Sequence, residues 1–192
     1  KVRHLGVGLG LETAGKASQF GSLGDIALIA ERFTFVRPVV DWAHVHAMSN
    51  GALTSPEAFA AEFSFVRERF PGWATDPLHC HFSDNLFGPQ GEIRHTTYGE
   101  GTLRVTPLAE AAAAARVRMT LISEARDDAS HRAIEEEWAT ASAAARSRPT
   151  SGEDRPLGPG RVAFPAPITA HSDGDAFTVD LDRPVRVTNL DK

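Results

Sequence analysis

The chain has 192 residues, an ordinary hydrophobic content of 42% and a net charge of −5. It has no apolar run of about 18 residues that could span a membrane, and its acidic balance argues against a general nucleic-acid binder. The one cysteine excludes an intrachain disulfide and, together with the lack of an apolar signal peptide, favours a cytoplasmic protein.

Segments of strand length alternate with helical segments along residues 1–146, the order of a parallel-sheet α/β protein. The predicted strands cover residues 7–11, 35–41, 77–82 and 119–123. The predicted helices cover residues 22–32, 55–70, 106–116 and 130–146. Three helix starts carry a serine that can cap the first turn: Ser22 with Asp25 as its capping-box partner, Ser55 before a proline, and Ser130.

Two connections between these elements are long. Residues 42–54 follow the second strand and residues 83–105 follow the third, and both are predicted to be loops. A loop as long as the second one is usually functional when it belongs to a compact domain. The helix between the two loops is predicted to pack in the core through one face, formed by Phe59, Phe63, Val66 and Phe70.

The composition changes after residue 146. Residues 147–176 are a Pro/Gly-rich linker without hydrophobic periodicity, and residues 177–192 contain short alternating segments that predict strands of a following module. The four β/α units of residues 1–146 are half of an eightfold TIM barrel, and an isolated half would expose two sheet edges and its inner face. We therefore expect a half TIM barrel and a chain that is a fragment of a longer protein.

Each predicted strand ends on a side chain that can bind a metal. These side chains are, in chain order, Glu12, Asp41, His81 and Glu124. Because parallel strands end at the same edge of a sheet, the four are expected to converge on one divalent cation. A single strand-end carboxylate is more often merely solvated, but four successive endings favour a metal. His44 and His95 could hold a further ion, and bound cations would reverse the local negative charge.

The remaining buried candidates have structural interpretations. His79 lies on the same face as His81 but one layer deeper, which predicts a hydrogen-bonded core histidine. Cys80 points to the opposite face and is predicted to be a small buried hydrophobe. His46 is a weaker metal candidate than His44.

These motifs resemble the endonuclease IV family, also called AP endonuclease family 2. Residues 11–23 are similar to its Glu-Thr-x-Gly-Lys-x-x-Gln-Phe-Gly block, and residues 41–47 are similar to its Asp-Phe-x-His-x-His-Ala block. Further blocks of the family resemble residues 79–83, 91–95 and 122–124. The resemblance extends over about residues 5–138 in the same order.

The resemblance implies the C-terminal half of a TIM barrel that hydrolyses DNA at abasic sites. It implies up to three zinc ions in the intact parent, with manganese or another divalent ion as the alternative. By position, Glu12 would bridge two metals, and the second metal would also bind Asp41, His81 and Glu124. Glu12 and Glu124 would thereby serve in catalysis.

His44 and His95 would hold the third metal. One position departs from the family, because Ile93 stands where many members have an aspartate, and Glu92 is adjacent but out of register. A water activated by the metals would attack the phosphorus, so no protein nucleophile is required. This agrees with the absence of a Ser-His or Cys-His arrangement in the sequence.

The tail carries a second resemblance. Residues 186–192, Arg-Val-Thr-Asn-Leu-Asp-Lys, are similar to the opening of the polymerase module of bacterial ligase D. This implies a parent that joins an abasic-site nuclease to an end-joining module, with abasic DNA as its partner and no membrane. Two alternatives stay open: a one-metal sugar isomerase or epimerase of the xylose-isomerase-like class, and a catalytically degenerate barrel that serves as a repair scaffold.

Overall fold

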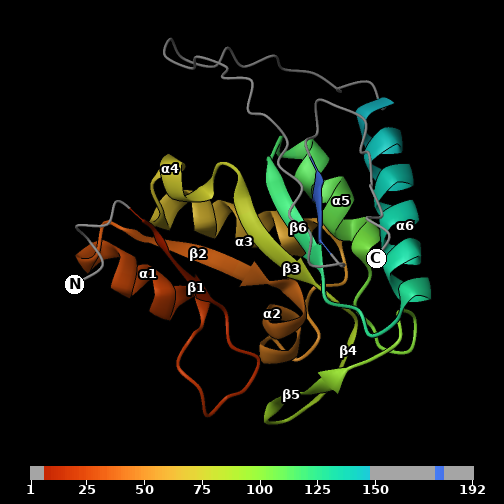
Figure 1. The fold of residues 1–192 in the computed structure, drawn as a ribbon, viewed down its shortest axis with the longest axis horizontal. Coiled ribbons are helices and arrows are strands. Elements are labelled where there is room, and N and C mark those ends of the chain that lie inside the picture. The colour runs from red at the N-terminus through yellow and green to blue at the C-terminus, as the bar shows by residue number, and fades with distance from the viewer. Residues whose placement is uncertain (1–6, 148–175, 180–192) are drawn as a thin grey trace.

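The computed structural model describes residues 7–147 and 176–179, which are drawn in colour in Figure 1. Within them, one sheet has the strand order β1-β2-β3-β6-β7; the first four strands are parallel and β7 is antiparallel. The strands of this sheet are β1 Leu9–Glu12, β2 Val36–Asp41, β3 Leu78–Phe82, β6 Met119–Ser123 and β7 Ala176–Val179. The four predicted strands are confirmed, and the described residues have a mixed α/β fold.

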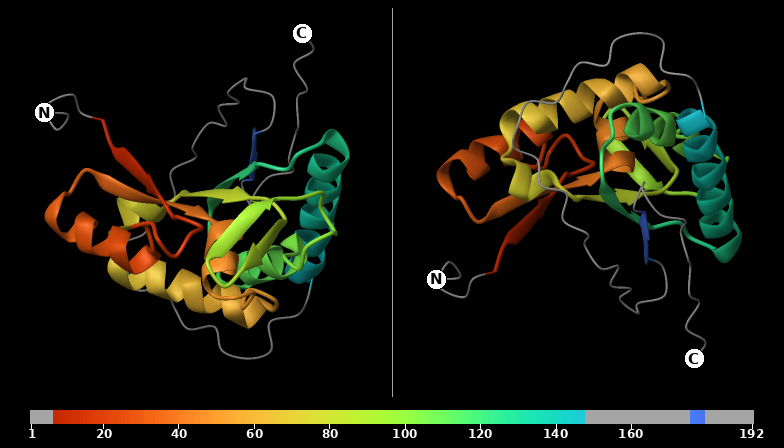
Figure 2. Two further views of the ribbon diagram at one scale, coloured as in Figure 1. Left: turned by 90° about the horizontal axis from the view of Figure 1, so that it is seen from below. Right: turned by 90° about the horizontal axis from the view of Figure 1, so that it is seen from above.

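The helices follow the strands in the expected alternation. They are α1 Leu23–Arg32, α2 Trp42–Met48, α3 Pro56–Arg69, α4 Gly72–Thr75, α5 Val105–Ala114 and α6 Asp128–Ser147. Figure 2 shows α1, α3 and α5 on the same side of the sheet. None of the described helices combines the length and apolar content that crossing a bilayer requires.

One face of the parallel sheet is buried and the other is partly open. In β3, Leu78, Cys80 and Phe82 are buried, whereas His79 and His81 between them are only partly covered. The strands β2 and β6 repeat this alternation, which follows from the twofold period of side chains along a strand. The predicted burial of Cys80 is confirmed, and burial raises the pKa of its thiol.

The core lies between the sheet and the helices. Trp42 stands edge-on to Phe59 and to Phe63, with ring centroids 5.4 Å apart in both pairs. All three rings are buried, and aromatic pairs of this geometry add about 0.5–1.5 kcal/mol beyond their buried area. The predicted apolar stripe of α3 is thus part of the core.

Helix caps explain where the helices begin. The Ser22 hydroxyl accepts the N–H of Asp25, whose carboxylate accepts the N–H of Ser22, so the predicted capping box is present. The Ser55 hydroxyl likewise accepts the N–H of Ala58 at the start of α3. The predicted cap of α6 was wrong by three residues: the Asp127 carboxylate accepts the N–H of Ser130 and is therefore the cap.

Both predicted long loops contain regular structure. Residues 42–54 include the helix α2, so His44 lies in the first turn of a helix and not in a loop. Residues 83–105 include a β-hairpin of two antiparallel strands, β4 Asn85–Gly88 and β5 Gly91–His95. The hairpin lies beyond the C-terminal ends of the parallel strands (Figure 1), which brings it to the edge where the strand-end side chains stand.

The strand β7 stands at the predicted start of the following module. It pairs with β6, so residues 176–179 add a strand to the sheet of the first domain. The predicted linker falls mainly on residues 148–175, and the second resemblance falls on residues 186–192. These segments lie outside the described residues.

Candidate metal centre

The four strand-end residues converge at one edge of the sheet. Each of them places one ligand atom within 4.8 Å of the ligand atoms of the others, and together they form the strand-end cluster: Glu12, Asp41, His81 and Glu124. The sheet register accounts for this convergence, because Asp41 pairs with His81, and His81 pairs with Ile122, two residues before Glu124. The predicted convergence is confirmed.

His81 lies between two carboxylates of this cluster. Its Nδ1 atom is 3.2 Å from Glu12 Oε1 and 3.1 Å from Glu124 Oε1. The hydrogen bond with Glu12 raises the pKa of His81 and lowers the pKa of Glu12. Burial instead raises the pKa of Glu124. A cation at this place would meet one nitrogen and two oxygen donors, a set that suits zinc and related divalent ions.

Asp41 is the buried member of the cluster. Its Oδ1 atom accepts the N–H groups of Ala43 and His44 at 2.7 and 3.1 Å and so caps α2. Its Oδ2 atom is buried and has no hydrogen-bond partner among the described residues. Burial raises the pKa of Asp41, since a charge is costly away from water. A cation would supply the missing partner, so the residues fit a metal.

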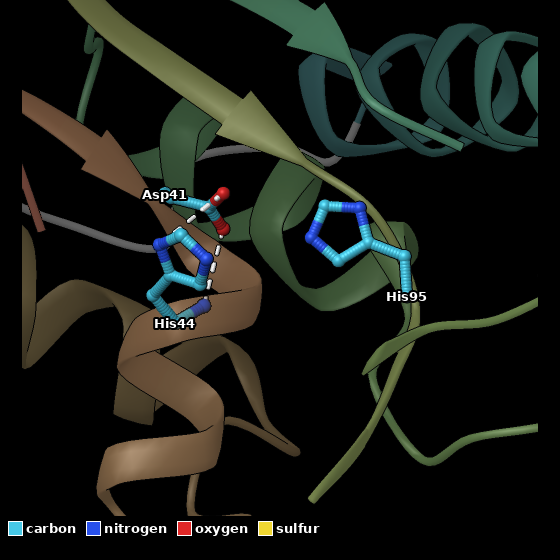
Figure 3. Close-up of side chains that lie close together, drawn as sticks. All are labelled: Asp41, His44 and His95. Carbon is cyan, nitrogen blue, oxygen red and sulfur yellow. Dashed lines mark hydrogen bonds and ion pairs between the residues drawn. The ribbon is translucent and has the colours of Figure 1, made fainter. Parts of the chain in front are cut away.

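A second donor group shares Asp41. Asp41, His44 and His95 also place ligand atoms within 4.8 Å of one another, and Figure 3 shows the imidazoles approaching Asp41 from α2 and from the end of β5. Each Nδ1 lies at a backbone carbonyl to which it donates: His44 to Thr13 at 2.7 Å and His95 to Glu124 at 3.1 Å. This is the outer-sphere arrangement that orients metal-binding histidines through their other nitrogen.

Glu92, the neighbour of the position where the family has its aspartate, lies between these two histidines. Its Oε2 atom is 3.2 Å from His44 Nε2, and its Oε1 atom is 3.3 Å from His95 Nε2. Burial opposes its ionisation, but hydrogen bonds from His44, His95 and Asn85 hold the pKa of Glu92 below its ordinary value. Burial likewise opposes protonation of His44, yet Glu92 and Asp41 raise the pKa of His44 to about 9.

The other two histidines of the motifs lie outside both groups. His46 is buried; its Nδ1 accepts the N–H of Leu53 and its Nε2 donates to the Thr102 hydroxyl at 2.9 Å. Both ring nitrogens of His46 are therefore used structurally. His79 is partly buried, and its ring stands 5.4 Å from that of His81. Burial lowers the pKa of both His46 and His79.

The structure adds supporting residues that the sequence motifs did not single out. The Thr13 hydroxyl accepts the N–H of Asp41 at 2.9 Å and thereby fixes the end of β2 against β1. A Cβ atom at Gly15 would lie 2.6 Å from the His44 ring, so only glycine lets this loop pack on His44. Both residues belong to the Glu-Thr-x-Gly block, so this block could have identified them from the sequence.

One Ser-His contact exists, although the sequence suggested none. Ser123 Oγ lies 2.7 Å from His131 Nδ1. Ser123 is buried at the end of β6, on the face that the helices cover. Its hydroxyl is therefore inaccessible to a substrate, and the pair joins β6 to α6.

Comparisons with known proteins give limited information. An uncharacterised protein of Methanocaldococcus jannaschii is 29% identical over 97 residues, which cover 50% of this chain and 35% of that protein. The chain thus spans about a third of the length of this curated relative. No protein-family model matches the chain, and no solved structure matches it significantly.

Proposed function

We propose that this chain is half of an endonuclease IV-like TIM barrel and belongs to a zinc-dependent enzyme that hydrolyses DNA at abasic sites. The observation that supports it most is the pair of donor groups that share Asp41. Sites with two or more neighbouring divalent ions are the usual arrangement for phosphodiester hydrolysis. The parallel order β1-β2-β3-β6, with helices on one side, is also compatible with part of a barrel.

The side chains divide into exposed and enclosed donors. The Glu12 and Glu124 side chains are 42% and 36% exposed, so water and a phosphate group can reach them. Asp41 is enclosed and is fixed by the cap of α2 and by the strand register. Bound cations would supply an activated water near neutral pH and would neutralise charge on the phosphate oxygens.

Glu12 and Glu124 reach the same point at this edge of the sheet. Both carboxylates contact the same imidazole nitrogen, His81 Nδ1, and burial raises the pKa of Glu124 while the hydrogen bond to His81 lowers that of Glu12. A cation held between these carboxylates would position and activate the attacking water. In this proposal Glu12 and Glu124 are the catalytic residues, as the resemblance implies.

A one-metal isomerase or epimerase is the second candidate. The strand-end cluster alone favours it, because four donors from successive strands can hold one divalent ion. The group around His44 and His95 favours the nuclease, since a one-metal reaction does not need it. The proposed partner is DNA with abasic sites, joined through the following segment to an end-joining module as the second resemblance implies.

The test is incision of a duplex that carries a single abasic site. Because the proposal makes these four units half of a barrel, the assay uses the polypeptide that contains both halves, loaded with zinc. We expect nicking at the abasic site and none on the undamaged duplex. Conversion of an aldose or ketose without nicking would favour the isomerase, and DNA binding without either activity would favour a scaffold.

A further inference from the structure

We propose that the cavity between α1, α2 and α3 binds a small organic cation, an alkylammonium or alkylguanidinium ion, and that Glu62 is its counter-ion. We call this cavity the Glu62 pocket. Its volume is about 310 Å³, which lies at the lower end of the range for small-molecule sites. No residue of the two donor groups lines it. The proposal therefore goes beyond the nuclease activity and does not rest on it.

Glu62 lies on α3 without a partner of opposite charge. Its neighbours on the helix surface, three and four residues away, are all apolar: Ala58, Phe59, Phe65 and Val66. Glu62 is partly buried, and among the described residues it has neither a hydrogen-bond partner nor an ion-pair partner. Burial is what raises the pKa of Glu62. A cation in the pocket would supply the missing counter-charge.

The walls around this carboxylate are largely apolar. They are formed by Leu23 at the start of α1, by Val45 and Met48 on α2, and by Phe65 on α3. Phe65 lies one turn after Glu62, so the two side chains are neighbours on the surface of α3. The Met48 side chain is 41% exposed, which leaves the pocket open to solvent at α2. Apolar walls with a single charge suit a ligand that has an alkyl chain and a charged end.

The hydroxyl groups of the pocket already hold structural hydrogen bonds. The Thr13 hydroxyl accepts the N–H of Asp41 at 2.9 Å, and the Ser22 hydroxyl accepts the N–H of Asp25 at 3.1 Å. The Ser49 hydroxyl donates to the His46 carbonyl at 3.1 Å. Glu62 is therefore the polar side chain of the pocket that remains available to a ligand.

This chemistry favours an organic cation over a metal ion or an anion. A metal ion needs several donor side chains, and Glu62 is the one carboxylate that lines the pocket. An anion would be repelled by Glu62. The start of α1, which would attract an anion, is already occupied by the Asp25 carboxylate, which accepts the N–H of Ser22 at 3.0 Å. An ammonium or guanidinium ion needs one carboxylate and no further ligand.

The pocket lies behind the candidate metal centre. Thr13 lines it and also holds two residues of the donor groups, because its hydroxyl accepts the Asp41 N–H and its carbonyl accepts the His44 ring N–H. Val45 and Met48 belong to α2, which begins directly after Asp41. A ligand in the Glu62 pocket would thus contact both elements that position Asp41.

The experiment measures binding of simple cations to the full chain. Pentylammonium and pentylguanidinium are titrated by calorimetry in the presence of a chelator, so that the amine cannot bind through a metal. We expect saturable binding to the wild type and an affinity at least about 10-fold lower in Glu62→Gln, because hydrogen bonds to charged groups are the stronger ones. Glu68→Gln makes the same chemical change on the exposed part of α3 and should leave the affinity unchanged.

The chain length of the probe tests the apolar walls. Affinity should rise from ethylammonium to pentylammonium by up to about fourfold for each added CH₂ group, and pentanol should bind more weakly than pentylammonium. Glu62→Gln removes a partly buried charge, so its Tm should be no lower than that of the wild type. A matching Tm shows that a loss of binding is not a loss of folding.

Three results would overturn the proposal: no saturable binding of either cation to the wild type, equal affinities in the wild type and Glu62→Gln, or equal affinities for pentanol and pentylammonium. Blocked arginine, with both backbone ends capped, represents a side chain of a partner protein. It should bind more weakly than pentylguanidinium, and tighter binding would overturn the assignment to a small molecule.

Discussion

Asp41 and His44 are joined by the first turn of α2. Asp41 Oδ1 accepts the His44 N–H at 3.1 Å, and Asp41 Oδ2 lies 3.5 Å from His44 Nδ1. One carboxylate therefore begins the helix and also belongs to both donor groups. This turn sets how the strand-end cluster lies relative to the second donor group of Asp41, His44 and His95. It is rigid because it is hydrogen-bonded and buried.

The two roles of Asp41 can be separated by substitution. Asn is as good a helix cap as Asp, so Asp41→Asn should keep α2 but lose the charge that both donor groups share. We expect the metal-free variant to be at least as stable as the wild type, because it removes a buried negative charge whose Oδ2 atom has no hydrogen-bond partner among the described residues. Zinc affinity should fall at both sites, as measured by calorimetry.

Asp41→Ala is the matched comparison. It removes the cap as well, and it should reduce the free energy of unfolding by about 0.5–2 kcal/mol relative to Asp41→Asn. Chemical denaturation of both variants in the presence of a chelator measures this difference. Full zinc binding by Asp41→Asn would contradict the shared role.

A second prediction concerns the turn before Glu92. Gly91 has φ of +93°, and a Cβ atom there would lie 2.1 Å from the Gly15 carbonyl oxygen. Gly91→Ala should therefore displace the hairpin and lower the free energy of unfolding by about 1–3 kcal/mol. Because His95 lies at the end of this hairpin, the substitution should also weaken cation binding by the group of Asp41, His44 and His95. Gly72→Ala is the control, because a Cβ atom at this residue, at the start of α4, would meet no atom of the described residues within 4 Å. Equal effects of the two substitutions on zinc stoichiometry would argue against this view.

A third prediction concerns removal of the metal. A ligand that binds only the folded state stabilises it by about 2.7 kcal/mol per site at a free concentration 100 times its Kd. Zinc should therefore raise the Tm of the chain, and a chelator should return it to the metal-free value. Thermal unfolding across a zinc titration measures the effect. A Tm that does not change with zinc would contradict binding at either of the two donor groups that share Asp41.

A fourth prediction concerns acid stability and lies far from the metal ligands. The hydrogen bond with Ser22 and the backbone N–H groups at the start of α1 lower the pKa of Asp25 below its ordinary 3.8. A lowered folded-state pKa means that the stabilisation is present above pH 3.8 and is lost as the pH falls through the folded value. Asp25→Asn should remove this part of the acid dependence, as measured by denaturation at neutral pH and near pH 3. An unchanged acid dependence would show that the capping box contributes nothing to it.

The convergence of the strand-end cluster could be predicted because it depends only on parallel strands ending at one edge. Each of its four residues follows an apolar run of strand length: Glu12, Asp41, His81 and Glu124. The register of the parallel strands then brings them side by side. The sequence does not predict α2, because this short helix, Trp-Ala-His-Val-His-Ala-Met, follows β2 without a break. Asp41 is both the last residue of the strand and the cap of the helix.

The position of Glu92 between His44 and His95 could not be predicted from strand ends. Its placement depends on one unpaired residue, Ile93, in a hairpin that the sequence presented as a loop. Side-chain alternation along a regular strand would send Glu92 away from His95, and a bulge leaves no reliable mark in a single sequence. The hydrogen bond between Glu92 and Gly15, residues far apart in the chain, fixes the result.

The last prediction concerns catalysis in the polypeptide that holds both halves of the proposed barrel. Glu12→Gln keeps the shape of the side chain but removes the charge that, by the resemblance, lets one carboxylate bridge two cations. Without that charge His81 also loses its hydrogen-bonded anionic partner at 3.2 Å. We expect abasic-site incision to fall by several orders of magnitude, with a matching loss of bound zinc.

His79→Gln is the comparison, because His79 lies one layer deeper and outside both donor groups. It should lower the Tm and leave the number of bound zinc ions unchanged. Normal incision by Glu12→Gln would end the metal-bridging assignment, and equal zinc loss in both variants would mean that Glu12 acts only through the packing around His81.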